Sequence, residues 1–138
     1  MAAITESVSL EKQGDIGLLL VDNPPVNALS WHVREGLAKG MQQAIEDPSI
    51  KAIVLACKGR TFIAGADIRE FSQAPRGASL REVQDAMENS PKPVIAAIHG
   101  TALGGGLEVA MCAHYRVGDP KAQYGQPEVK IGLLPGAG

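Results

Sequence analysis

Cysteine is scarce in this sequence: Cys57 and Cys112 are the only two among 138 residues. Neither has a second cysteine or a histidine at the spacing typical of zinc ligands, so a zinc site is not indicated. Two isolated cysteines also provide no disulfide framework of the kind that stabilises small secreted domains. We therefore expect a protein that works in a reducing compartment.

Long apolar runs are absent as well. No stretch approaches the roughly 18 to 20 apolar residues that a helix needs to cross a bilayer. The N-terminal residues include Glu6 and Glu11, and they lack the basic segment followed by an apolar stretch that marks a secretory leader. We expect a soluble, cytoplasmic protein with no membrane partner.

An excess of charge of one sign is also missing. The 13 lysines and arginines and the 15 aspartates and glutamates give a formal net charge of −2, and both signs are scattered along the chain. Binding to nucleic acid would call for a basic stripe, and binding to an anionic lipid surface for a polybasic segment. Neither is present, so the expected partner is a small molecule.

The residues that build a core are plentiful, since 45% are hydrophobic and 20% are charged. At this length one domain is expected. An apolar run at residues 16–21 predicts a buried strand, and Ser30 is placed to cap an amphipathic helix that ends before Pro48. A second apolar run at residues 51–57 predicts another strand. The strand–helix–strand order favours parallel pairing through a right-handed crossover.

The rest of the chain predicts shorter elements. We expect a loop over residues 59–66, a helical turn capped by Asp67, and a mobile loop over residues 71–78. After these come a helix from Ser79 through Met87, a central strand at 94–98, a loop at 101–106, a buried helix at 107–112, a strand at 115–117 and an extended piece at 123–126. The order indicates an α/β fold.

Three consecutive glycines at residues 104–106 follow the predicted central strand and precede a helix. Such a turn lets a ligand approach backbone N–H groups, which favours an anion or a developing oxyanion. The alternative is a turn kept small only so that helix and sheet can pack closely. A dinucleotide fingerprint is excluded, because Val109 stands where its third glycine belongs.

Two carboxylates lie close to turns of this kind. Glu108 falls in the first turn of the helix after the glycines, where a carboxylate commonly serves only the helix dipole. Glu128 lies between Pro127 and Val129, where it would by default be a solvated loop residue. Together, however, two carboxylates near tight turns are what general acid–base chemistry at one carbon centre requires.

Three strings of the sequence resemble the signature blocks of the crotonase, or enoyl-CoA hydratase/isomerase, superfamily. They are IAGADIREF at 63–71, HGTALGGGLEVAMCAHYRV at 99–117 and YGQPEVKIGLLPGAG at 124–138, in the order and spacing of the family. The segment NPPVNAL at 23–29 is more similar to the hydratase/isomerase region of multifunctional fatty-acid β-oxidation proteins than to single-function hydratases. The resemblance implies the crotonase-like ββα spiral, with residues 1–138 forming part of one such domain.

The resemblance also implies the residues of the site. The backbone N–H groups of Ala66 and Gly105 correspond to the oxyanion hole for a thioester carbonyl, and Glu108 and Glu128 correspond to the two catalytic glutamates. These would hold a water molecule and move its protons during addition to the double bond.

Three more positions match residues that the family places near coenzyme A or the reacting water. The backbone of Ala64 corresponds to a contact with the adenine of coenzyme A, and Gly136 to backbone that helps to place the water. Arg69 stands where relatives often carry a basic residue, which allows either a phosphate contact or a solvated helix arginine.

The function implied is that of a 2-enoyl-CoA hydratase of fatty-acid β-oxidation, with 3-enoyl to 2-enoyl isomerisation as a second reaction. Two N–H donors aimed at one oxygen stabilise a thioester enolate, so no metal and no cofactor beyond the coenzyme A carrier is expected. Cys57, Cys112 and the histidines His32, His99 and His114 have no nucleophile–base context, so we expect them to be structural.

The resemblance departs from the family in length, because the family continues past the GAG turn at 136–138. We therefore expect a spiral truncated at its C-terminal side, which would self-associate or pair with the remainder. The alternative function is a catalytically incomplete fragment that only binds acyl-CoA or that remainder. A crotonase relative with other chemistry, such as a hydrolase or dehalogenase, is a third hypothesis, and the presence of both glutamates argues against it.

Overall fold

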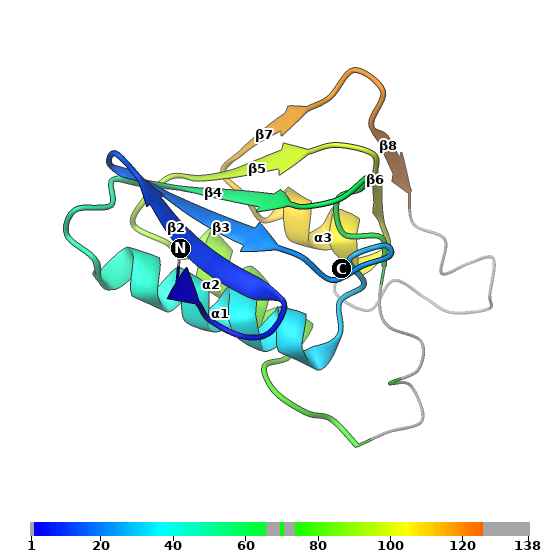
Figure 1. The fold of residues 1–138 in the computed structure, drawn as a ribbon, viewed down its shortest axis with the longest axis horizontal. Coiled ribbons are helices and arrows are strands. Elements are labelled where there is room, and N and C mark those ends of the chain that lie inside the picture. The colour runs from blue at the N-terminus through cyan, green and yellow to red at the C-terminus, as the bar shows by residue number, and fades with distance from the viewer. Residues whose placement is uncertain (1, 66–69, 71–73, 126–138) are drawn as a thin grey trace.

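The computed structural model describes residues 2–65, 70 and 74–125. Within these ranges the chain forms two β-sheets and three α-helices (Figure 1). The strands are β1 (Ala2–Ala3), β2 (Val8–Gln13), β3 (Ile16–Val21), β4 (Ala52–Cys57), β5 (Val94–Ile98), β6 (Thr101–Leu103), β7 (Tyr115–Gly118) and β8 (Gln123–Gly125). The helices are α1 (Trp31–Glu46), α2 (Leu80–Glu88) and α3 (Gly105–Met111).

The larger sheet has six strands in the order β1-β2-β3-β4-β5-β7. Its first three strands pair antiparallel, and β3, β4, β5 and β7 pair parallel. Leu19 of β3 lies beside Leu55 of β4, which lies beside Ala96 of β5, and all three are buried. The predicted parallel pairing of the runs 16–21 and 51–57 is confirmed, and so is the α/β class.

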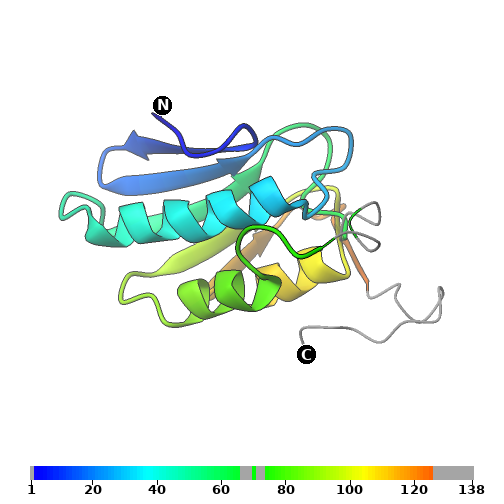
Figure 2. The same ribbon diagram turned by 90° about the horizontal axis from the view of Figure 1, so that it is seen from below.

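All three helices cover one face of this sheet, as the view from below shows (Figure 2). Helix α1 places Val33, Leu37, Met41 and Ala44 in the core, on the apolar face that the sequence predicts. A β-carbon at Gly40 would lie 2.3 Å from Leu19 Cδ1, so the helix backbone lies directly on β3 at that point. The core is therefore the layer between the sheet and its helices.

Two strands, β2 and β6, differ from what the sequence predicts. The sequence does not predict β2, which forms a hairpin with β3 through the turn at Gly14 and whose second half is largely exposed. Strand β6 replaces part of the loop expected at 101–106, because residues 101–103 pair in parallel with 123–125. Three residues are too few to show a periodicity, and the partner strand is distant in sequence.

Helix α3 also begins earlier than expected. It starts at Gly105, two residues before the predicted start at Leu107. Glycine disfavours helix interiors because of its conformational freedom, so a run of glycines looks like a turn in the sequence. Here Gly105 and Gly106 form the first turn of the helix, and only Gly104, at φ +53°, precedes it.

The small sheet of β6 and β8 lies at the end of the large sheet toward which the parallel strands point (Figure 1). Ala64, beyond the end of β4, bridges to Leu103 at the end of β6. The loops that follow β4 and β5 are thereby brought together at the carboxyl ends of the strands, where α/β sheets commonly bind ligands.

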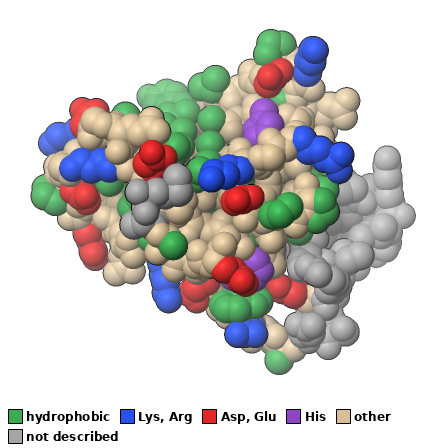
Figure 3. All heavy atoms as spheres, in the orientation of Figure 1, with side chains coloured by type: hydrophobic (Ala, Val, Ile, Leu, Met, Phe, Trp, Pro, Cys, Tyr) green, Lys and Arg blue, Asp and Glu red, His purple; other side chains and the backbone are tan. Residues whose placement is uncertain are grey.

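The surface carries charges of both signs side by side. On the face shown in Figure 3, lysines and arginines alternate with aspartates and glutamates, and neither sign forms a large patch. None of the helices in the described part of the chain is both long and apolar enough to cross a membrane.

The side chain of Asn27 joins the loop before α1 to the loop that follows β4. It is buried and has a positive φ of 54°. Its side-chain nitrogen donates to the carbonyls of Lys58 and Thr61 at 2.9 and 2.8 Å, and its side-chain oxygen accepts from the N–H of Asn23 at 2.7 Å. Asparagine suits the position, because it tolerates the left-handed region and its amide satisfies all three groups.

Replacing Asn27 by alanine is expected to lower the free energy of unfolding by about 2 to 4 kcal/mol, because buried polar groups lose their partners. Denaturant unfolding followed by circular dichroism measures this. Asn27→Gly is the matched control for backbone strain, since glycine accepts the positive φ but also lacks the amide. Equal stability of Asn27→Gly and the wild type would contradict the role given to the side chain.

Candidate functional site

The glycine turn has a different physical cause at each of its three positions. Gly104 has a positive φ. A β-carbon on Gly105 would lie 2.8 Å from Leu29 Cδ1, which is the flexible end of a side chain. A β-carbon on Gly106 would lie 1.9 Å from the carbonyl oxygen of Ile63, which is backbone and cannot move aside. Close packing thus explains Gly106 fully, as the simpler of the two interpretations requires.

Gly105 is compatible with the other interpretation, in which the turn offers a backbone N–H group to a ligand. As the first residue of α3 it has no carbonyl four residues earlier in the helix to receive its N–H. Among the residues that the structure describes, no hydrogen bond from this N–H is found, although Gly105 is buried. A buried N–H of this kind is suited to donate to a ligand oxygen.

Glu108 projects from the first turn of α3 and is only 5% exposed. It lines a cavity of about 270 Å³ between α2 and α3. The cavity is lined by Arg81, Gln84, Asp85, Glu88, Glu108, Met111 and Cys112. Gly105 is not among these residues, so the structure puts the carboxylate and the Gly105 N–H on one helical turn but not in one described cavity.

The cavity is acidic and partly polar. Three carboxylates and one cation, Arg81, line it, and Gln84 is buried there with its side-chain oxygen unpaired among the described residues. Burial raises the pKa of the Cys112 thiol to about 11, the hydrogen bond and charge of Glu88 add to the rise, and a hydrogen bond from Gln84 opposes it. A thiol with this pKa stays protonated at neutral pH, so Cys112 is not an activated nucleophile.

Cys57 is likewise unreactive. Burial raises the pKa of its thiol to about 12, and a hydrogen bond from the backbone of Ile63 only partly offsets this. In the described part of the chain, no group of three His, Cys, Asp or Glu side chains is arranged to hold a metal ion.

The three histidines make contacts that join elements of the fold. His99 Nε2 lies 2.8 Å from the Gly59 carbonyl, and His114 Nδ1 accepts the N–H of Val94 at 3.0 Å. His32 lies in a polar cluster with Ser7, Ser30 and Glu6 at the start of α1. Ser7 is buried, and these contacts connect the β1–β2 loop with the helix, which fits a structural role.

Ala64 lies beside the residue that precedes the glycine turn, because it bridges to Leu103. Its N–H donates to the carbonyl of Val26 at 3.1 Å. The next residue, Gly65, accepts through its carbonyl the N–H of Leu29 at 2.9 Å. The backbone on both sides of this bend is therefore held by the segment that leads into α1.

The remaining predicted site residues, Ala66, Glu128 and Gly136, lie outside the described residues, as do Asp67 and Arg69. The carbonyl of Gly125 in β8 accepts the N–H of Gly104 at 2.8 Å. Strand β8 therefore contacts the glycine turn at Gly125, and Glu128 follows three residues later in the sequence.

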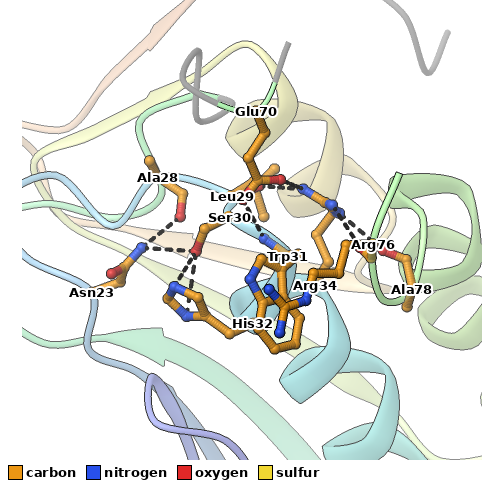
Figure 4. Close-up of polar contacts among 10 residues, drawn as sticks. All are labelled: Asn23, Ala28, Leu29, Ser30, Trp31, His32, Arg34, Glu70, Arg76 and Ala78. Carbon is orange, nitrogen blue, oxygen red and sulfur yellow. Dashed lines mark hydrogen bonds and ion pairs between the residues drawn. The ribbon is translucent and has the colours of Figure 1, made fainter. Parts of the chain in front are cut away.

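The start of α1 differs from the prediction that Ser30 caps it. Ser30 is the capping residue by position, but its hydroxyl makes no capping bond and instead accepts from the Asn23 amide at 3.2 Å. The carboxylate of Glu70 accepts the N–H of Trp31 at 2.8 Å and pairs with Arg34 at 3.2 Å (Figure 4). Nothing local in the sequence signals this cap, because its partners lie 39 residues apart.

Sequence comparison identifies relatives of this chain. The sequence model of the family described as Enoyl-CoA hydratase/isomerase matches residues 11–138. A peroxisomal bifunctional enzyme of Danio rerio is 49% identical over 123 residues, which cover 89% of this chain and 17% of that protein. A probable enoyl-CoA hydratase of Bacillus subtilis (strain 168) is 41% identical over 140 residues, covering 94% of this chain and 53% of that protein.

The fold leads to the same family. The crystal structure of an enoyl-CoA hydratase from Mycobacterium avium subsp. paratuberculosis K-10 superposes with a TM-score of 0.88 at 26% identity, over 99% of this chain and 56% of that chain. This chain thus spans about half or less of the length of these relatives. The crotonase fold expected from the sequence is confirmed. The chain belongs to the enoyl-CoA hydratase/isomerase family.

Proposed function

We propose that this protein adds water across the C2=C3 double bond of a 2-enoyl-CoA thioester. The observation that carries the proposal is the buried carboxylate of Glu108, three residues after the N–H of Gly105 at the start of α3, in a chain of the enoyl-CoA hydratase/isomerase family. Fatty-acid β-oxidation is the proposed setting, because three multifunctional plant relatives carry that term in their names.

The proposed chemistry begins at the thioester carbonyl. Addition of water oxygen at C3 moves electron density through C2 onto the carbonyl oxygen, which becomes an enolate oxygen. The N–H groups of Gly105 and Ala66 would donate to this oxygen. Donors fixed in place before the reaction stabilise such charge without reorganisation, and each contributes about 3 to 4 kcal/mol to lowering the barrier.

Proton transfer is assigned to Glu108 and Glu128. One carboxylate would accept a proton from the attacking water, and the other carboxyl group would deliver a proton to C2 of the enolate. The same pair could move a proton between C2 and C4, which would shift a 3-enoyl double bond to the 2-position. Isomerisation is therefore proposed as a second reaction of one site.

The substrate is proposed to bring its own carrier, coenzyme A, and the reaction is proposed to need neither a metal nor another cofactor. Backbone at Ala64 and Gly136 is proposed to contact coenzyme A and to help place the water. A cytoplasmic location also remains a proposal, because the names of several relatives refer to peroxisomes.

A hydration assay that follows the loss of enoyl absorbance tests the function, in parallel with a titration by a saturated acyl-CoA. Turnover on the order of 1 to 1000 per second, unchanged by EDTA, is expected. Binding of the saturated ester without any hydration would favour the alternative, an acyl-CoA-binding protein without catalytic activity.

Replacing Glu108 or Glu128 by glutamine is expected to lower kcat for hydration by about 100-fold or more, since the amide cannot transfer protons but has nearly the same volume. The Kd of the saturated acyl-CoA should stay close to that of the wild type. The exposed Glu46 at the end of α1 provides the control Glu46→Gln, which should leave kcat unchanged. A variant that keeps more than about a tenth of the activity would refute the role of that residue.

A comparison of Gly105→Pro with Gly105→Ala isolates the proposed donor. Proline is favoured at the first position of a helix and has no N–H, whereas alanine adds a β-carbon and keeps the N–H. In both, that β-carbon must displace Leu29 Cδ1. We expect kcat of the proline variant to be about 100- to 1000-fold below that of the alanine variant. Equal kcat values in two folded proteins would exclude this donor.

A further inference from the structure

Leu29 contacts both turns of the candidate site. Its N–H donates to the carbonyl of Gly65 at 2.9 Å. Its side chain is buried, and its Cδ1 lies where a β-carbon on Gly105 would come within 2.8 Å. One residue therefore fixes the position of the bend at Gly65 through a hydrogen bond and of the start of α3 through packing.

Leu29 is held in turn by Arg34. The Nη1 atom of Arg34 donates to the Leu29 carbonyl at 2.6 Å, and Nε donates to the Ala78 carbonyl at 2.9 Å (Figure 4). Nη2 donates to the Arg76 carbonyl at 3.2 Å. The planar guanidinium is suited to this arrangement, because its donors point in fixed directions to several acceptors at once.

Glu70 completes the arrangement. One carboxylate oxygen pairs with Arg34 Nη1 at 3.2 Å, and the other accepts the N–H of Trp31 at 2.8 Å. The side chains of Arg34 and Glu70 are only 18% and 21% exposed, which limits screening of the ion pair by water. Arg76 also stacks on the Trp31 ring, with 3.9 Å between its guanidinium carbon and the ring centroid. The 74–78 segment is thus fastened to the start of α1.

We propose that Arg34, oriented by Glu70, is a positioning residue for the hydration reaction, an inference that rests on the function proposed above. Arg34 holds Leu29, and Leu29 holds the Gly65 carbonyl and the Gly105 turn. Arg34 therefore positions the proposed Gly105 donor, through the side chain of Leu29, without contacting the substrate.

Replacing Arg34 should affect stability and kcat differently, depending on whether its role is structural or positioning. If Arg34 only stabilised the fold, its replacement would lower the free energy of unfolding but leave kcat of the folded protein unchanged. If it positions the Gly105 donor, which acts on the transition state, its replacement lowers kcat while KM changes little. The two roles can therefore be separated by kinetics at a temperature where every variant is folded.

The test compares Arg34→Lys, Glu70→Gln and the control Lys39→Gln with the wild type in hydration of a 2-enoyl-CoA. Lysine keeps the charge at position 34 but cannot reach the four acceptors with its single nitrogen. Lys39 is an exposed cation on the same helix. The second measurement is hydrogen exchange of the Leu29 amide, which reports directly on its bond to Gly65.

For Arg34→Lys we expect kcat to fall about 10- to 100-fold, as misplacement of reacting groups by about 1 Å commonly costs. KM should stay within about threefold, and the Leu29 amide should exchange faster. Glu70→Gln should show a smaller loss, and the double variant should lose less than the sum of the two effects. Lys39→Gln should match the wild type in all respects. Should Arg34→Lys not fold, Glu70→Gln provides the same readouts.

A folded Arg34→Lys protein with wild-type kcat would overturn the positioning role, whether or not Leu29 exchange changes. A fall in kcat with unchanged Leu29 exchange would overturn it too, because Arg34 is proposed to act by holding Leu29 in place. An inactive wild type would overturn the proposed function, and the positioning role with it. That outcome is distinct, since it is seen before any variant is compared.

Discussion

The backbone of α3 touches the backbone of the 61–64 segment at Gly106, and the arrangement of the candidate site depends on this contact. A β-carbon at Gly106 would lie 1.9 Å from the Ile63 carbonyl oxygen, so no other residue fits without moving one of the two segments. The same carbonyl accepts the N–H of Leu103 at 3.3 Å, and Ala64 bridges to Leu103. Two loops that are distant in sequence are thereby joined in a fixed relation.

The parallel sheet explains why these loops meet. Strands β4 and β5 are neighbours and run in the same direction, so the segments that leave their carboxyl ends emerge side by side. A few residues beyond these ends, the Thr61 hydroxyl donates to the Thr101 carbonyl and accepts the Thr101 N–H. The glycine turn and the bend at Gly65 follow within a few residues. Leu29 contacts both, and the Arg34–Glu70 ion pair holds Leu29.

Much of this fold could be predicted from the sequence, because its central elements carry strong local signals. The strand at 16–21 is continuously apolar, and the helix after Ser30 has an apolar face of period 3.6. Glu108 and Gly105 could be singled out from their place after three glycines and from the family's motif. Both lie in the first turn of α3. Their catalytic roles remain predictions.

Other features could not be predicted, because they arise only from tertiary contacts. The cap on α1 comes from Glu70, 39 residues after Trp31, and the neighbouring Ser30 hydroxyl is used elsewhere. Strand β6 exists only because residues 123–125 lie beside it. Gln84 reads as an ordinary helix residue in the sequence, yet it is buried at the cavity that contains Glu108.

Infrared spectroscopy of a bound thioester tests the proposal that the N–H groups of Gly105 and Ala66 donate to one carbonyl oxygen. A saturated acyl-CoA carrying ¹³C at the thioester carbonyl would be measured free and bound to the protein. Donation from two N–H groups polarises the C=O bond, so its stretching frequency should be lower in the complex than in water. A bound carbonyl that absorbs at the same frequency as the free ester would exclude donation from these two N–H groups.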